Sequence, residues 1–360
     1  MLKKELSRVA PDYRRMVAAA ENCRSEILPL YEHNVSCKII DELAGSDVCG
    51  RMESGDFDAA FAAYGEFFRL AGYDVVTFEY CIGAAMPPGG ALRGGMGPIQ
   101  SRADLEAFPW EQIPDRYWDL AAPMFEALGR RMPYGMKAIG GVGNGAFELA
   151  EDLVGLQYLP FLEADDPEAH AELYRRIGDL METIWTRFLK EFGELYCVCR
   201  IGDDLGFRSS LLTMPDTVRQ LVIPQYKRVI DRVHAAGKPF LLHCCGCIFE
   251  VMDDLIAAGI DAKHSNEDAI APFERWIHDY SDRIGLFGGI DMDFIVSRSP
   301  EEIRRKIDAE APRFRDLANG FAIGTGNSIP DYVPAENYLA MLEAVNAYRD
   351  SLSQDRKSVV

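Results

Sequence analysis

A junction in which an amphipathic helix ends at a glycine and a short apolar run follows is the strongest pattern along the chain. It occurs at Gly72, Gly237 and Gly259, and each glycine suits the left-handed position that ends a helix. The runs that follow are mostly apolar, as expected for strands buried on both faces. Further runs of strand character cover residues 136–140, 195–201, 284–290 and 320–324.

Helix starts are equally clear between these runs. Asp166 and Ser299 are each followed by proline and glutamate, which places a capping side chain before proline at the first helical position. Strands and helices alternate from about residue 70 to 350, which implies parallel strands joined by helical crossovers. About seven or eight such units favour an α/β fold of the (β/α)8 TIM barrel type. A doubly wound open sheet is the alternative, but no G-x-G-x-x-G motif follows the first strand.

The domain organisation follows from where this alternation begins and ends. We expect residues 1–60 to form an N-terminal helical extension, residues 61–350 to form the barrel, and residues 351–360 to form a polar tail. No linker rich in proline or serine and no block of like charges divides the chain. The glycine-rich stretch 83–97 is a candidate lid, with an ordinary surface loop as the alternative.

Composition narrows the classes of partner. Among the 360 residues, 38 Lys and Arg stand against 57 Asp and Glu, so the formal net charge is −19, and 48% of residues are hydrophobic. The apolar content is typical of a well-packed globular protein. The negative charge argues against nucleic acids and anionic membranes as partners. No apolar run approaches the roughly 20 residues of a membrane helix, and no apolar segment follows the basic N-terminus as in a secretory signal.

The cysteines point to chemistry. There are nine, an odd number, and three of them, Cys244, Cys245 and Cys247, lie within four positions. This distribution does not resemble a disulfide framework. We therefore expect a cytoplasmic protein with thiols kept for metal binding or catalysis.

Polar residues that end the apolar runs are the candidate site, because the active site of a parallel barrel lies at the C-terminal ends of its strands. They are Glu79, Tyr80, Asn144, Asp203, Asp204, His243, Cys245, His264, Asp291 and Asn327. Apart from histidine, none of them is basic, which disfavours phosphate substrates.

His243 and Cys245 are the sharpest feature of this set. One residue separates them, so both side chains point to the same face of an extended backbone, and an imidazole with a thiolate suits Zn2+. The alternative is a buried apolar Cys245 beside a hydrogen-bonded His243. Glu79 and Asp204 are candidates for metal ligands, general acid or base groups, or helix caps.

Residues 241–246 (LLHCCG) resemble the His-x-Cys-Gly strand end of corrinoid-linked methyltransferases. These enzymes belong to the uroporphyrinogen decarboxylase (URO-D) superfamily, whose fold is a (β/α)8 barrel. Residues 138–143, 284–291 and 324–337 support the resemblance, which spans about residues 60–350.

The resemblance implies a zinc-dependent methyltransferase that exchanges a methyl group between a corrinoid carrier protein and a small thiol, methoxy compound or similar molecule. His243 and Cys245 would hold Zn2+, and Glu79 or Asp204 would complete the site or relay a proton. A further set would contact substrate: Tyr80, Asn144, His264, Asp291 and Asn327. A homodimer is also expected, on the basis of the family resemblance alone.

Two departures from the family pattern keep alternatives open. True uroporphyrinogen decarboxylases resemble one another in an Arg-rich N-terminal segment and in a Phe-Ser-Asp-like strand end. This chain lacks the first and has Tyr80 about where that aspartate would fall. Decarboxylation of a porphyrinogen or another polycarboxylate is therefore the second hypothesis, disfavoured by the acidic charge. A non-catalytic barrel that binds a small molecule or a corrinoid protein is the third.

The second departure concerns zinc. Asn327 stands where the thiol-methylating branch has another Cys, and Asn is a poor zinc ligand beside a thiolate. Either the third ligand is Glu79, Glu148, Asp204 or Cys247, or the metal is lost.

Overall fold

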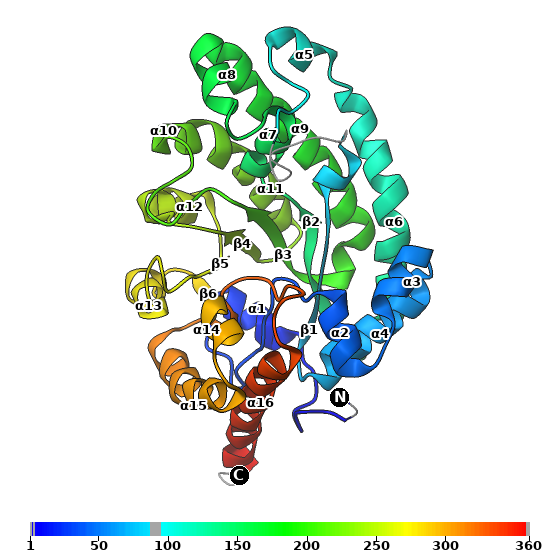
Figure 1. The fold of residues 1–360 in the computed structure, drawn as a ribbon, viewed down its shortest axis with the longest axis vertical. Coiled ribbons are helices and arrows are strands. Elements are labelled where there is room, and N and C mark those ends of the chain that lie inside the picture. Colours follow the sequence, from blue (N-terminus) through cyan, green and yellow to red (C-terminus); the bar gives the residue numbers. More distant parts are fainter. Residues whose placement is uncertain (1, 3, 87–94, 358–360) are drawn as a thin grey trace.

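The computed structural model describes residue 2 and residues 4–86 and 95–357. Its single sheet contains β1 (Val75–Cys81), β2 (Lys137–Gly143), β3 (Tyr196–Asp203), β4 (Phe240–Cys244), β5 (Ala262–His264), β6 (Gly285–Ile290) and β7 (Phe321–Thr325). The strands are all parallel and their spatial order is their order in the sequence. A doubly wound sheet would reverse this order, so that alternative is wrong. Figure 1 shows the curled sheet at the centre of the molecule with helices around it.

The long helices form the outer layer. They are α4 (Phe57–Leu70), α6 (Ile113–Arg131), α9 (Pro167–Phe192), α11 (Ile223–Ala235), α15 (Pro300–Leu317) and α16 (Ala335–Lys357). Shorter helices are α1 (Arg14–Ala20), α2 (Cys37–Ala44), α3 (Val48–Ser54), α5 (Arg102–Ala107), α7 (Ala146–Val154), α8 (Leu159–Asp165), α10 (Pro215–Thr217), α12 (Met252–Ala258), α13 (Phe273–Tyr280) and α14 (Met292–Ser297). The predicted caps are confirmed, because Asp166 caps α9 and Ser299 forms a capping box on α15.

Helix α1 closes the N-terminal end of the curled sheet. Met16, Ala19 and Ala20 of this helix are fully buried in one cluster with inward-facing residues of all seven strands. The strand residues are Val75, Ile139, Cys197, Val198, Leu241, Ala262, Phe287 and Ala322. An apolar floor at this end leaves the opposite, C-terminal end of the strands for polar groups.

An N-terminal segment, residues 29–35, lies between β7 and β1. Leu30 pairs with Ile323 of β7 as an isolated parallel bridge. The Thr77 hydroxyl of β1 donates to the Glu32 carbonyl oxygen at 2.7 Å. Among the described residues no ladder joins β1 to β7 directly. The separate N-terminal helical extension expected from the sequence is therefore not confirmed, since this segment enters the gap in the sheet.

The two ends of the chain meet at the start of β1. The Asp74 carboxylate is 2.7 Å from both Arg15 and Arg349, and the Ser7 hydroxyl donates to Asp350 at 2.8 Å. Helix α16 continues to Lys357, so most of the expected C-terminal tail is helical. Figure 1 shows both termini at this end of the molecule.

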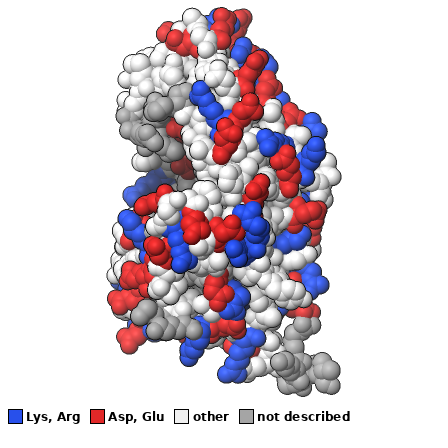
Figure 2. Space-filling model, turned by 90° about the vertical axis from the view of Figure 1, so that its right-hand side faces the viewer, with Lys and Arg blue, Asp and Glu red and all other residues white. Residues whose placement is uncertain are grey.

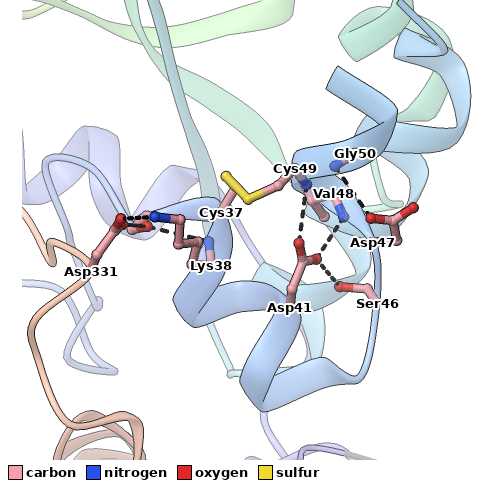
Figure 3. The surroundings of a disulfide bond; sticks show 10 residues. Cys37, Lys38, Asp41, Ser46, Asp47, Val48, Cys49, Gly50 and Asp331 are labelled. Carbon is pink, nitrogen blue, oxygen red and sulfur yellow. Dashed lines mark hydrogen bonds and ion pairs between the residues drawn. A yellow bond between two sulfur atoms is a disulfide. The ribbon is translucent and has the colours of Figure 1, made fainter. Parts of the chain in front are cut away.

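The expectation that the cysteines form no disulfide is wrong for two of them. Cys37 and Cys49 are bonded, with their Cα atoms 5.3 Å apart, and the bond joins α2 to α3 (Figure 3). The Asp41 carboxylate makes a second link, because it accepts hydrogen bonds from the backbone of Val48 and Cys49 at 2.6 and 3.0 Å. The two helices lie side by side only in the folded chain, so cysteine spacing could not indicate the pairing. The other seven cysteines are free.

Two surface features can be read from the described residues. None of the helices in the described ranges combines the length and apolarity needed to cross a membrane. Figure 2 shows one face on which Lys and Arg are interspersed with Asp and Glu, rather than gathered into a basic patch. The candidate lid falls largely on residues 87–94, which lie outside the described residues.

Candidate metal centre

Three ligand-type side chains meet at the C-terminal ends of β3 and β4. One ligand atom from each of Asp204, His243 and Cys245 lies within 4.8 Å of the others. The Cys245 sulfur is 3.4 Å from His243 Nε2. The sheet explains the meeting, since Gly202 of β3 pairs with His243 of β4 and the two strands then end together. The structure thus brings Asp204 to the pair His243 and Cys245, which the sequence analysis proposed as metal ligands.

A chain of hydrogen bonds fixes the tautomer of His243. His264 Nε2 is 2.9 Å from the Thr325 carbonyl oxygen, which only accepts, so Nε2 carries the hydrogen. His264 Nδ1 then holds a lone pair and accepts from His243 Nδ1 at 2.7 Å. Burial lowers the pKa of His243 well below its usual range and that of His264 to about 3, so both rings are neutral. His243 Nε2 is therefore left with a free lone pair beside Cys245.

The surroundings of Cys245 favour a cation. Burial, with the Asp204 carboxylate close by, raises the pKa of the Cys245 thiol to about 12. A thiol in this setting stays protonated at neutral pH unless a positive charge replaces its proton. Nitrogen, sulfur and oxygen donors on three residues are ligand types that zinc accepts, and catalytic zinc sites use three protein ligands.

Asn327 lies against Cys245 but is not placed as a ligand. Its Nδ2 donates to the Cys245 sulfur at 3.6 Å, while its Oδ1 accepts from the Ser328 backbone at 2.8 Å. The Ser265 hydroxyl also donates to the sulfur, at 3.7 Å. These two weak donors would stabilise a thiolate at Cys245. Neither side chain takes the place of the additional Cys that the thiol-methylating branch has at position 327.

The other candidates for a third ligand have partners elsewhere. Glu148 accepts a hydrogen bond from Asn144 at 2.8 Å. Glu79 is ion-paired with Arg200 at 2.7 Å. Among the described residues, Cys247 is not grouped with Asp204, His243 and Cys245 as a possible ligand. Of the four alternatives, the geometry favours Asp204.

Arg200 is a functional residue that the sequence analysis missed. It lies fully buried in β3, where its guanidinium donates to the Tyr31 hydroxyl at 2.7 Å and to the His33 carbonyl at 2.9 Å. Burial alone would lower its pKa, but the Glu79 carboxylate outweighs this and the pKa is raised. A charged residue inside an otherwise apolar run, CVCRI, was the available signal. The strand-end candidates include no basic residue besides histidine, and Arg200 instead contributes a positive charge from within β3.

His33 was also missed. Its ring stacks on His243 with centroids 3.6 Å apart, and its Nε2 is 3.8 Å from Glu79 Oε1. Its Nδ1 is buried without a hydrogen-bond partner. Burial, together with the charge of Arg200, lowers the pKa of His33 well below its usual range. No predicted strand covered this residue, so the sequence carried no signal for it.

Two predicted residues at the β1 and β2 ends have structural surroundings. Tyr80 points away from Glu79, and its ring contacts the Tyr117 ring of α6 at 5.7 Å between centroids. Asn144, in the left-handed region with φ +72°, accepts from the Gly83 backbone at 2.9 Å. Neither side chain reaches the metal centre.

Two predicted acids act as helix caps. Asp203, one residue before Asp204, accepts from the α7 backbone at Phe147 and Glu148, at 2.9 and 2.8 Å. Burial raises its pKa to about 6. Asp291 caps α14 and, with Asn327, lines a cavity of about 380 Å3 at the strand ends.

Comparisons with known proteins agree with this architecture. A family model described as uroporphyrinogen decarboxylase (URO-D) matches residues 97–348. A methyltransferase from Methanosarcina mazei has a similar structure, with TM-score 0.74 and 16% sequence identity, over 96% of this chain and 99% of that one. A β-mannanase from the blue mussel Mytilus edulis is less similar, with TM-score 0.44 and 11% identity over 89% of this chain and 92% of that one. This similarity is too low to indicate a shared function. No curated protein gives a significant sequence match.

Proposed function

Because the chain belongs to the uroporphyrinogen decarboxylase family, we propose that it is a zinc-dependent methyltransferase. It exchanges a methyl group between a corrinoid carried by a partner protein and a small molecule. The observation that carries this proposal is the hydrogen-bond chain from Thr325 through His264, which leaves His243 Nε2 unprotonated beside Cys245 and Asp204.

The residues present fit a zinc ion. His243, Cys245 and Asp204 would hold it, and bound zinc would supply Lewis acidity to a thiol or a methoxy oxygen. His264 keeps the hydrogen of His243 on Nδ1, so the ring cannot turn its protonated nitrogen to the site. Asn327 and Ser265 donate to the sulfur and stabilise its negative charge.

Electrostatics favour this reaction over decarboxylation of a polycarboxylate. The buried guanidinium of Arg200 is already paired with Glu79 at 2.7 Å, and the buried ammonium of Lys263 donates to the Ser265 carbonyl oxygen. A substrate with several carboxylates would therefore meet Glu79 and Asp204 without an unpaired guanidinium to bind it.

Exposed apolar side chains support a protein partner at the same end of the sheet. Phe207 and Met214 follow β3 and Tyr332 follows β7, and they are 61%, 66% and 72% exposed. Large apolar side chains of this kind are enriched at protein interfaces. We therefore place the docking site of the corrinoid protein at this end of the sheet.

The proposal has two further parts. The protein is cytoplasmic, and the sheet closes into a barrel of eight positions in which residues 29–35 take the eighth.

The proposal is tested with free methylcobalamin as the methyl probe. Zinc-loaded, reduced protein should demethylate it with a small thiol, or methylate cob(I)alamin from a methoxy compound, as read from the cobalt absorbance. Asp204→Asn should abolish transfer, whereas Asp282→Asn, on an exposed carboxylate, should not. Release of CO2 from uroporphyrinogen that is insensitive to chelators, with no methyl transfer, would overturn the proposal.

A further inference from the structure

A cavity of about 280 Å3 lies beside the metal centre, between residues 33–37, α3 and β1. We call it the β1 cavity; its lining includes His33, Cys37, Met52, Tyr64, Glu79 and Arg200. The His33 ring forms one wall and stacks on His243 at 3.6 Å between centroids. The cavity therefore ends one ring away from a proposed zinc ligand. A cavity of about 150 Å3 already holds benzene, so the β1 cavity has room for a small ring with a substituent.

One polar atom in this wall is available to a ligand. Glu79 Oε2 is paired with Arg200 at 2.7 Å, whereas the contact that Oε1 makes among the described residues is to His33 Nε2 at 3.8 Å, which is beyond hydrogen-bond distance. His33 Nδ1 also lacks a partner, but this atom is buried within the protein and does not open into the cavity. A carboxylate oxygen that lines a cavity without a donor indicates where the donor group of a ligand would bind.

Glycine keeps space open beside the carboxylate. A Cβ atom at Gly143 would lie 2.6 Å from the Cys81 sulfur and 3.3 Å from the Glu79 carboxyl carbon. Any other residue at this position would therefore crowd Glu79. The position of the Glu79 carboxyl group therefore depends on the absence of a side chain at residue 143.

The charges of the lining select a class of ligand. Arg200 and Glu79 carry opposite charges and are in contact at 2.7 Å, so neither charge is left free for a charged ligand. An anionic ligand would face the Glu79 carboxylate with no unpaired cation, and burying such a charge is costly. Val35, Val48, Met52 and Phe78 supply apolar wall, and the uncharged polar residues Asn34, Ser36 and Thr77 also line the cavity.

The outer wall is held in place by two links between helices. Figure 3 shows the Cys37–Cys49 disulfide and the Asp41 carboxylate bridging α2 and α3. Cys37, Val48 and Met52 of these helices line the cavity. A wall fixed before binding lowers the entropic cost of taking up a small ligand.

We propose that the β1 cavity binds the small-molecule substrate, and that this substrate is uncharged, with an apolar body and one hydroxyl or N–H group that donates to Glu79. Calling this ligand the substrate rests on the proposed function, but the test below measures binding alone. Three probes of one shape separate the charge classes: benzyl alcohol, benzoate and benzylammonium.

Binding is measured by calorimetry on the full-length protein, with and without zinc. Benzyl alcohol should bind at least tenfold more tightly than benzoate or benzylammonium. Met52→Trp should fill the cavity and abolish binding without changing zinc content, whereas Leu120→Trp, on the exposed side of α6, should bind normally. Glu79→Gln leaves Arg200 unpaired and should shift the preference toward benzoate.

Each outcome has one meaning. Equal or tighter binding of benzoate or benzylammonium to the wild-type protein would overturn the neutral-ligand assignment. Binding of benzyl alcohol that survives Met52→Trp would overturn the cavity assignment. Failure of methyl transfer with these binding results intact would refute the proposed function and leave the β1 cavity as a ligand site. If Glu79→Gln fails to fold, the Met52→Trp comparison still decides.

Discussion

At the scale of single residues, the hydrogen-bond chain through His264 determines which nitrogen of His243 is free. The Thr325 carbonyl only accepts, and this fixes both rings in sequence, at 2.9 and 2.7 Å. The ring of His243 is thus set before any ion binds, which reduces the ordering that binding must cost.

This relay predicts opposite results for two substitutions of His264. In His264→Asn, the amide oxygen still accepts from His243 Nδ1, so zinc affinity should stay within about threefold of wild type. In His264→Leu, the acceptor is lost and affinity should fall about 10- to 100-fold. Competition with a chelating dye measures both. Equal affinities for the two variants would show that the relay does not orient His243.

A second residue-scale prediction concerns Glu32. Burial raises its pKa to about 8, while the Thr325 backbone and hydroxyl donate to it. Because the folded pKa is raised above the unfolded value of about 4.3, the stabilisation is complete below about pH 4 and is lost as pH rises through 8. Urea unfolding should show wild type losing on the order of 4 kcal/mol relative to Glu32→Gln between pH 4 and 9.

The control for this titration is an exposed glutamate. Glu194, whose side chain is fully exposed, should give the same pH dependence of unfolding free energy as wild type when changed to glutamine. A pH-independent difference between wild type and Glu32→Gln would mean that Glu32 is ionised in the folded protein.

At the scale of elements, α2 and α3 form a pair that is tied twice. The disulfide and the Asp41 carboxylate both join them, and α2 begins four residues after His33. The pair therefore positions the segment that completes the site as well as the wall of the β1 cavity.

Removing the disulfide should destabilise the protein without unfolding it. Closing a loop with 12 residues of separation contributes about 3 kcal/mol by the chain-entropy relation. The double variant Cys37→Ser, Cys49→Ser should lose about this much free energy of unfolding in urea. Cys23→Ser, at an exposed free thiol, should change it by less than about 0.5 kcal/mol. Equal effects would show that the bond does not form in solution.

At the scale of the whole molecule, the two ends of the sheet have separate tasks. The N-terminal end is closed by α1 and by the ion pairs of Asp74, whereas the C-terminal end carries the candidate ligands Asp204, His243 and Cys245. Stabilising contacts and candidate ligands thus lie at opposite ends of the sheet, as is general in parallel barrels.

A substitution at the N-terminal end tests this separation. Asp74→Asn leaves the fully buried guanidinium of Arg349 without its counter-charge, which should cost about 3–5 kcal/mol of unfolding free energy. Zinc content should be unchanged in the protein that remains folded. Asp350→Ala, which loses only the acceptor for Ser7 and the Arg8 backbone, should cost about 1 kcal/mol. Loss of zinc in Asp74→Asn would show that the two ends are coupled.

Sequence patterns could predict the features that depend on residues close together in the chain, namely the strands and the residues at their ends. The seven strands were readable because helix-ending glycines and apolar runs recur, and His243, Cys245 and Asp204 were readable as strand ends. Contacts between distant segments were not. Glu32 lies 293 positions from Thr325, and Arg200 lies 121 from Glu79.

The N-terminal segment was the largest omission for the same reason. Residues 29–35 form no regular strand of their own and pair through two isolated bridges, Leu30 with Ile323 of β7 and Val35 with Ile329 after it. Their periodicity therefore gave no strand signal, although they supply His33 to the site. The Cys37–Cys49 pairing depends on two helices meeting in the fold, which no local pattern records.

The most direct test of the central claim is the zinc content of protein purified anaerobically and kept reduced, measured by mass spectrometry of the metal. The account predicts one zinc per wild-type chain and its loss in His243→Ala, Cys245→Ser and Asp204→Asn. Cys247→Ser, a nearby thiol outside the ligand group, should keep it. Wild-type protein without stoichiometric zinc, or zinc retained in Cys245→Ser, would contradict the account.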